Sequence, residues 1–419
     1  MSTVEKFIPT KKYNTIAYAL IAVGLITAIA LYISTHGAAA SEEEAHRNHA
    51  RFWASLLQNS VYFLLVVNAA MFFMCATTLA WGSWQLAFSR VTEAVSSAVP
   101  VIGVIAAVIL LSIVFGDNHV IYHWTDTEHV KHDEILNFKK GFLNKTFYTV
   151  ITLFTVIFWS FLGWKMRQRS RSLDTNPPRT LEEKKKFIWD NTVVAALYIV
   201  VFALTIMSSL PWLWLMSIDA HWFSTMYSWY TFASTFVAGM ALLTLYVVFL
   251  KNNGLLATVT KEHLHDLGKF MFAFSIFWTY LWFSQFMLIW YSNQPEETIY
   301  FINRIGNAER PGHYAGIFWT MLIINFVAPI LILMSRDSKR NYTIVTFVAV
   351  IILFGHWLDF YQMVFPAVSP DKVPAIVYDM GIALFFVGLI MLVVGRTLSK
   401  YPLEVKNHPF IKESVIHHT

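Results

Sequence analysis

Ten apolar runs of about 20 residues or longer dominate this sequence and constrain what it can fold into. They fall at about residues 15–35, 55–80, 95–116, 146–166, 190–210, 223–250, 270–291, 314–335, 342–364 and 377–396. An α-helix needs about 20 apolar residues to cross the roughly 30 Å hydrocarbon core of a bilayer. Only 14% of the residues are charged, against about a quarter in soluble domains. We therefore expect an all-α polytopic membrane protein with ten transmembrane helices.

The distribution of lysine and arginine predicts the orientation of these spans. If the spans alternate in direction, 22 of the 31 Lys and Arg residues fall on the side of the two termini and 9 on the other side. Because positive residues concentrate in cytoplasmic segments, we expect a multi-pass protein with both termini in the cytoplasm. The first run is longer than a signal-peptide core, so we expect it to remain as a span, although residues 38–40 resemble a cleavage site.

The net charge of +5 follows mostly from this asymmetry. The basic loop at residues 165–186 is suited to contact with anionic membrane lipid. Nothing else in the sequence favours nucleic acid, so we expect no nucleic-acid partner.

The sequence lacks the motifs of several cofactors. It has no CxxCH motif for covalent haem, no cysteine set for an iron–sulfur cluster and no Walker A loop for ATP. A transmembrane haem needs two facing histidines, and only His356 lies within a span. His119 and His123 have a spacing that suits a metal, but a third ligand is not evident. We therefore expect no metal and no covalently bound cofactor, and we expect Cys75 to be a small buried apolar residue.

Two pairs of similar segments suggest an internal repeat. Residues 51–63 resemble residues 221–233 at an offset of 170, and the basic segment after Met166 resembles the one after Met334 at an offset of 168. This spacing predicts two parallel four-helix bundles, formed by spans 2–5 and 6–9, with the first and last spans peripheral. The corresponding divisions of the chain are 1–50 (first span and outer loop), 51–210 (first bundle), 211–366 (second bundle) and 367–419 (last span and tail).

The ninth span carries the strongest polar constellation. Asp359 is the one carboxylate clearly within a span, and Asp379 stands at the start of the last span. His356 and Asp359 are three residues apart and therefore neighbours on one helical face, while Pro366 is expected to end the helix. Such a pair could exchange protons near the outer interface, or it could be a buried polar pair that ties helices together.

The exit of the seventh span permits two interpretations. Proline at the first helical position followed by two carboxylates commonly starts a helix, so Pro295, Glu296 and Glu297 predict a short surface helix up to about Arg304. The alternative is that Glu296 and Glu297 release protons or dock a partner at the outer side.

Three segments resemble a known family. They are MSIDAHWFSTMYSWYTFAS from Met216, DLGKFMFAFSIFWTYLWFSQFMLIWYSNQPEE from Asp266 and HWLDFYQMVFP from His356. They resemble the second quinone-type membrane subunit of bacterial alternative complex III, a quinol:cytochrome c oxidoreductase, within the NrfD-like polysulfide-reductase superfamily. The family pattern often has Leu and Pro in place of Ile218 and Ala220, and Ile in place of Gln294.

This resemblance implies a ten-helix subunit of the bacterial inner membrane with menaquinol as the expected electron donor of the complex. It implies haem c and iron–sulfur clusters in partner subunits: a sister NrfD-like membrane subunit, multihaem and monohaem cytochrome c subunits and an iron–sulfur subunit. The sister subunit is the better candidate for quinol oxidation. This chain would then contribute proton transfer and assembly.

The site that follows from this interpretation has three parts. His356, Asp359, Tyr361 and Asp379 are expected to form an outer polar site, with Asp219 and His221 nearby. Gln285 would continue the path inward, and His263, His265 and Asp266 would gather protons at the cytoplasmic face. Two other functions stay open. One is a secondary transporter, since Pro329 lies within the eighth span and Pro211 ends the fifth, although the matching region of the fourth span has Gly163 and no proline. The other is a purely structural scaffold of a respiratory complex.

Overall fold

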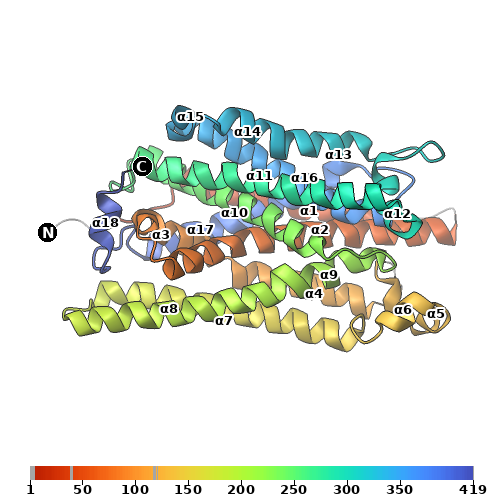
Figure 1. Cartoon of the computed structure of the whole chain (residues 1–419), viewed down its shortest axis with the longest axis horizontal. Helices are drawn as coiled ribbons and strands as arrows, with labels where there is room; N and C mark the ends of the chain where they lie inside the picture. The colour runs from red at the N-terminus through yellow and green to blue at the C-terminus, as the bar shows by residue number, and fades with distance from the viewer. Residues whose placement is uncertain (1–4, 38–40, 117–118, 120, 419) are drawn as a thin grey trace.

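The computed structural model describes residues 5–37, 41–116, 119 and 121–418 of the chain. The alanines at 38–40 that resemble a cleavage site lie outside these residues. Within the described ranges, ten helices are long and apolar enough to cross a membrane, which confirms the predicted fold class (Figure 1).

Seven of the ten spans are continuous helices: α1 (Lys11–Thr35), α2 (Glu42–Leu79), α7 (Lys145–Thr175), α10 (Met226–Asn252), α11 (Lys261–Ser292), α16 (Tyr342–Val368) and α17 (Ile376–Lys400). The other three are composite: α3 (Ser89–Ser96) with α4 (Val99–Phe115), α8 (Leu181–Leu204) with α9 (Leu210–Trp214), and α13 (Ala315–Leu322) with α14 (Ala328–Leu333). Shorter helices are α5 (Thr127–His132), α6 (Glu134–Lys139), α12 (Pro295–Ile305), α15 (Arg336–Arg340) and α18 (Ile411–Val415).

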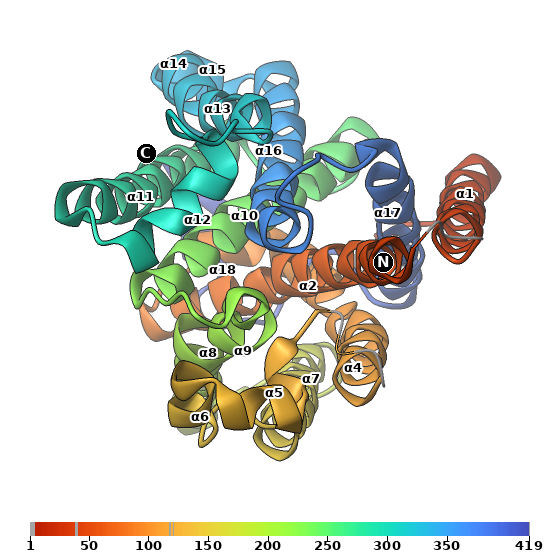
Figure 2. The same cartoon turned by 90° about the vertical axis from the view of Figure 1, so that its right-hand side faces the viewer.

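The spans pack as two four-helix bundles with a peripheral pair (Figure 2). Helices α2, α3–α4, α7 and α8–α9 form the first bundle, and α10, α11, α13–α14 and α16 form the second. Helix α10 joins the bundles by packing along α2, while α17 packs on α2 and carries α1 on its outer side. The two bundles and the two peripheral helices are those that the sequence repeat predicts.

Burial follows this arrangement. In α2 and α10, 83% of the most apolar stretch is buried, whereas in α1 the share is 17%. A helix that is apolar all round is either surrounded by protein or faces lipid. The central helices α2 and α10 are surrounded by protein, and α1 faces lipid.

Close helix contact holds the peripheral pair together. Gly388 of α17 lies against α1, where an added Cβ atom would be 2.6 Å from the backbone oxygen of Ala17. Membrane helices approach one another closely where a small residue leaves room for the partner backbone. This contact explains how α1 stays attached although it touches few other helices.

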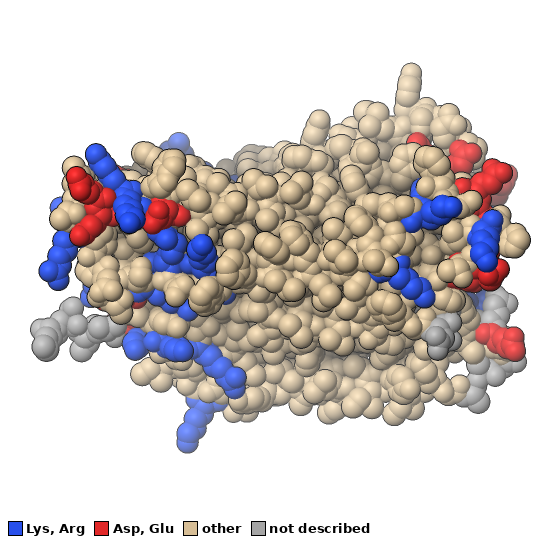
Figure 3. Space-filling view, turned by 90° about the horizontal axis from the view of Figure 1, so that it is seen from below, with Lys and Arg blue, Asp and Glu red and all other residues tan. Residues whose placement is uncertain are grey.

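Charged side chains gather at the two ends of the molecule. In the space-filling view of one face, Lys, Arg, Asp and Glu flank a wide band without visible charge (Figure 3). The first and last described residues lie at one end, which we term the terminal face, and we term the other end the outer face (Figure 1). This is the surface of a protein that spans a membrane.

The third span begins earlier than predicted. It starts at Trp84 instead of residue 95, because a 3₁₀ turn (Trp84–Phe88) and α3 precede α4. Arg90 and Glu93 of α3 are therefore buried inside a span, which corrects the view that Asp359 is the only such carboxylate. The sequence prediction missed this segment because the two charged residues lower its hydropathy. In the fold they pair with each other, with 3.1 Å between Arg90 Nη1 and Glu93 Oε2.

Pro366 does not end the ninth span. Helix α16 continues through it to Val368. The missing N–H of a proline normally frees the carbonyl four residues earlier. Here that carbonyl, of Gln362, accepts from Arg304 of α12 through Nε at 3.1 Å and Nη2 at 2.7 Å. The arginine replaces the lost helical donor, so the helix continues.

Candidate functional site

Asp359 lies fully buried on α16 at the centre of a ring of donors. Ser234 Oγ of α10 donates to its Oδ2 at 2.8 Å, and Trp278 Nε1 of α11 donates to the same oxygen at 2.9 Å. The hydroxyl of Tyr230, one turn before Ser234, donates to Oδ1. A carboxylate inside a membrane is costly unless such donors replace its water shell. Three donors from two neighbouring helices therefore hold Asp359 in place.

His356 is linked to this carboxylate through Ser234. Its Nδ1 lies 3.0 Å from Ser234 Oγ and 3.8 Å from Asp359 Oδ2. Because the single hydroxyl proton of Ser234 goes to Asp359, its oxygen accepts from His356, which assigns the imidazole proton to Nδ1. His356 Nε2 is then an acceptor, and it is buried without a hydrogen-bond partner among the described residues.

A π-helical segment packs on α16 at Gly355, the residue before His356. Residues 323–327 make one π turn between α13 and α14, and the fully buried Asn325 belongs to it. Both polar atoms of Asn325 lack a hydrogen-bond partner in the part of the chain that is described. Its Oδ1 would be 2.0 Å from a Cβ on Gly355, so only glycine fits next to His356 on this side. π turns occur frequently at functional sites.

A small cavity opens next to Asp359. It measures about 20 Å³, which is room for about one water molecule. Gln285, Arg304, Asp359 and Gln362 contribute to its wall, together with aromatic rings. Gln285 Nε2 and Gln362 Oε1 are buried and have no partner within the described ranges, so both are suited to hold water. The structure thus brings Gln285 and Asp359 to the wall of one cavity, while the polar path through them stays a prediction.

A quinone ring would not fit this cavity as it stands. For comparison, a cavity of about 150 Å³ binds benzene, which is several times the volume found here. A larger apolar cavity of about 330 Å³ lies at the outer face, with Trp222 in its wall. Trp222 stacks on Tyr300 at 4.0 Å, and Tyr300 in turn lines the cavity of Asp359. This ring pair lies between the two spaces, which are therefore separate.

Asp379 and Tyr361 belong to a second cluster and do not join Asp359. Asp379 is buried on α17 and pairs with Arg51 of α2, with Arg51 Nη2 at 2.5 Å from Oδ2. Ser55 Oγ donates to Asp379 Oδ1 at 2.5 Å. The Tyr361 hydroxyl donates to the backbone oxygen of Pro374 at 3.3 Å, on the side of this cluster. The expected single outer site is therefore divided, and Asp379 serves an ion pair that fastens α17 to α2.

The predicted outer-loop residues lie outside both clusters. His221 is exposed and its Nε2 lies 2.6 Å from Oδ2 of Asp133, while Asp219 is half-buried in the same loop. The backbone N–H of Leu136, followed by His221, lowers the pKa of Asp133 below its usual value. These residues form a loop contact at the outer face.

Glu296 and Glu297 lie in the first turn of α12 behind Pro295, as the helix-start interpretation predicts. Glu296 is exposed and Glu297 half-buried, and Ser292 Oγ donates to Glu297 at 3.3 Å. Glutamates at this position favour the helix start. Their main structural role is to begin the helix that carries Arg304.

The residues expected to gather protons at the terminal face do come together. Asp266 pairs with two basic side chains: its Oδ1 lies 2.5 Å from Lys269 Nζ, and its Oδ2 lies 2.5 Å from Nε2 of His417. The imidazole ring of His263 lies 5.3 Å from that of His417, and His265 is buried next to Asp266 in α11. His417, from the C-terminal tail, is a member that the sequence did not point to.

A further charged cluster at this face escaped the sequence analysis. Glu93 accepts from Ser170 Oγ of α7 at 2.5 Å as well as from Arg90, which also pairs with Asp174 at 2.7 Å. These contacts bind α3 to α7. The arrangement is a closed ion-pair network, which is more typical of a helix connection than of a reactive site.

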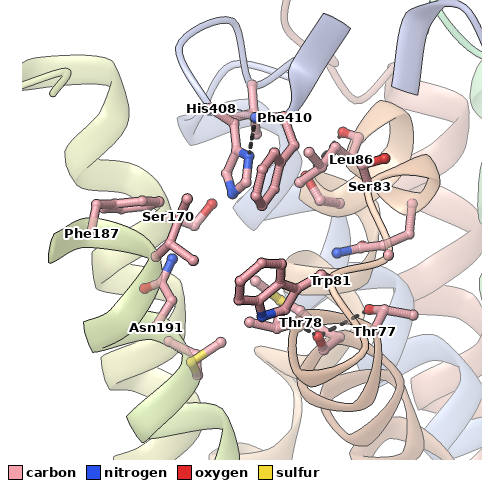
Figure 4. Close-up of a pocket in the computed structure, with 17 residues that line it drawn as sticks. Thr77, Thr78, Trp81, Ser83, Leu86, Ser170, Phe187, Asn191, His408 and Phe410 are labelled. Atoms are coloured by element: carbon pink, nitrogen blue, oxygen red, sulfur yellow. Dashed lines mark hydrogen bonds between the residues drawn. The ribbon is translucent and has the colours of Figure 1, made fainter. Parts of the chain in front are cut away.

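The cavity beside this network is shown in Figure 4. It measures about 50 Å³, and its wall includes Trp81, Ser170, Asn191 and His408. His408 comes from the C-terminal tail and accepts from the backbone N–H of Phe410 at 3.2 Å (Figure 4). Burial lowers the pKa of His408 to about 4, so this histidine is neutral at pH 7. The space suits a few water molecules.

Among the residues that the structure describes, no three His, Cys, Asp or Glu side chains are arranged to hold a metal ion. His119 instead contacts Thr125 Oγ1 at 2.6 Å. Cys75 is buried. Comparison with known proteins gives no match to a family model and none to a curated protein.

Proposed function

We propose that this chain is an integral membrane subunit of a quinol:electron-acceptor oxidoreductase of the alternative complex III type. It contributes proton transfer linked to quinol oxidation, and it assembles with haem and iron–sulfur subunits. The observation that carries the proposal is the carboxylate of Asp359, buried at membrane depth beside a space for water. The segments around Met216, Asp266 and His356 add the family resemblance.

Asp359, Ser234 and His356 form a short proton relay in this proposal. His356 Nε2, the free acceptor, takes up a proton while Nδ1 gives its proton to Ser234 Oγ. Ser234 at the same time passes its own hydroxyl proton to Asp359 Oδ2. The protonated Asp359 then releases its proton to the water next to Gln285 and Gln362. The chain itself performs no electron transfer here; menaquinol and the haem and iron–sulfur centres belong to the assembled complex and its partner subunits.

The proposed placement is the bacterial inner membrane with the terminal face in the cytoplasm. The excess of Lys and Arg at that face supports it. Asp359 lies nine residues, about 14 Å of helix, from the outer-face end of α16. Protons that pass through the relay would therefore leave toward the outer side.

The structure gives the transporter alternative little support. Transporters of the inverted or parallel repeat type interrupt matching helices of their two halves. The two π turns lie at residues 205–209 in the fifth span and 323–327 in the eighth. In the predicted repeat the fifth span corresponds to the ninth, so the interruptions do not match.

The test is purification of the tagged chain in a mild detergent, followed by a haem spectrum and a menaquinol-oxidation assay. We expect haem subunits to co-purify. Asp359→Asn, which keeps the shape of the side chain, should lower menaquinol turnover by about a hundredfold or more, the usual contribution of a positioned proton-transfer group. Glu296→Gln, at an exposed acid of similar chemistry, is the matched control and should retain turnover.

Purification without haem proteins would refute membership of the complex. Haem co-purification with full turnover in Asp359→Asn would refute the proton-transfer role and favour the scaffold function.

A further inference from the structure

A groove at the terminal face separates α1 from α10. It measures about 540 Å³ and lies between α1, α10 and α17. Its apolar wall is formed by Ile16, Leu242, Leu245, Phe249, Val387 and Met391. This volume is typical of sites that bind small molecules.

Apart from the hydroxyls of Tyr13 and Tyr246, the groove is polar at one end only. Thr10, Lys12 and Asn253 lie at its terminal-face end, where α1 begins and α10 has just ended. From Asn253 to Leu242 the wall follows eleven residues of helix, about 16 Å. This is close to half of the roughly 30 Å hydrocarbon core, which is one leaflet. A polar end followed by one leaflet depth of apolar wall matches a phospholipid.

The charge at the polar end selects the headgroup. Helix α1 starts with Lys11 and Lys12 and has no acidic residue in its first turn. Cations at this position oppose the positive end of the helix dipole, whereas an anion there is favourable. A phosphate group beside Lys12 would meet the ammonium group and the positive helix end together. The end of the groove is therefore suited to an anionic headgroup.

We propose that this groove binds one anionic phospholipid of the leaflet on the terminal side. The phosphate lies near Lys12, and an acyl chain runs along Leu245 and Leu242 toward the membrane centre. Bound in this way, the lipid fills the space between the peripheral pair and α10. The proposal does not depend on the function proposed above, because it uses none of the residues around Asp359.

Native mass spectrometry of the full-length chain in detergent tests this site. Phosphatidylglycerol and phosphatidylcholine with the same acyl chains are the probes. We expect one phosphatidylglycerol to bind in preference to phosphatidylcholine. Lys12→Gln should lower the affinity for phosphatidylglycerol about fivefold, the effect of one lysine near an anionic lipid surface. Lys11→Gln removes the same charge next to the groove and should change the affinity by less than about twofold.

A second variant tests the apolar wall. Ile16 is 42% exposed, so Ile16→Trp can fill the groove without entering the core of the protein. We expect it to reduce the binding of both lipids while the melting profile in detergent keeps a single transition. Equal losses in Lys11→Gln and Lys12→Gln, equal affinity for the two lipids, or unchanged binding in Ile16→Trp would each overturn the proposal.

Discussion

Arg304 shows how one residue can make a polar site possible inside a membrane. It is buried, its guanidinium lies 3.3 Å from the ring centre of Tyr300, and it donates twice to the Gln362 carbonyl that Pro366 leaves free. It also borders the cavity of Asp359. The arginine therefore supplies the hydrogen-bond donors that the Gln362 carbonyl lacks, and it places a positive charge near the carboxylate of Asp359.

Arg304→Met should destabilise the protein by about 1–3 kcal/mol, because the carbonyl of Gln362 loses its donors. Adding Pro366→Ala restores a backbone N–H to the helix, so the double variant should recover part of this loss. Thermal unfolding in detergent measures both, and Arg310→Met, at an exposed loop arginine, is the control. If the double variant were less stable than Arg304→Met, the assignment of Arg304 to the missing donor would be wrong.

The C-terminal tail is the element that closes the terminal face. Ser414 Oγ of α18 donates to the backbone oxygen of Trp84 at 2.9 Å and accepts from Ala87 at 3.0 Å. Asn407 donates to the backbone oxygen of Leu173 at 3.0 Å. His408 lies between these contacts. The tail thus packs on both the third span and α7.

Acid should loosen this tail. The pKa of His408 is near 4 when the tail is docked and near the ordinary 6.5 when it is free. Between about pH 6.5 and 4 the undocked tail binds more protons, so docking weakens as the pH falls through this range and changes no further below it. The amides of residues 401–418 should have lower protection factors, which are exchange rates corrected for the intrinsic pH dependence, at pH 5 than at pH 8.

In His408→Gln this difference should shrink, whereas His418→Gln, at an exposed histidine, should leave it intact. An unchanged pH dependence in His408→Gln would show that another group controls the tail.

Most of the elements could be predicted from the sequence, apart from the start of the third span and the continuation of α16 through Pro366, but their polar partners could not. The spans and the short helix at Pro295 were predictable because apolar length and helix-start residues act locally. The division between Asp359 and Asp379 was not predictable, since Arg51 is 328 positions from Asp379 and meets it only after folding. Asn325 could have been identified as a candidate site residue from the sequence, because it is a polar residue within the apolar run of the eighth span.

For the whole molecule, the proposed proton relay is confined to the second bundle, at contacts between α10, α11 and α16. The first bundle is closed at the terminal face by the network around Glu93. The peripheral pair α1 and α17 is fastened by Arg51 and by Gly388. Two bundles of similar topology therefore have different polar interiors, and in our account only the second transfers protons.

The most direct test of this account is redox-difference infrared spectroscopy of the purified complex, which detects the carboxyl stretching bands that change when quinol is oxidised. We predict a carboxyl band that disappears in Asp359→Asn and shifts in Asp359→Glu, while Asp379→Asn leaves it in place. A spectrum in which the carboxyl bands of Asp359→Asn and the unaltered protein coincide would contradict the claim that Asp359 exchanges a proton.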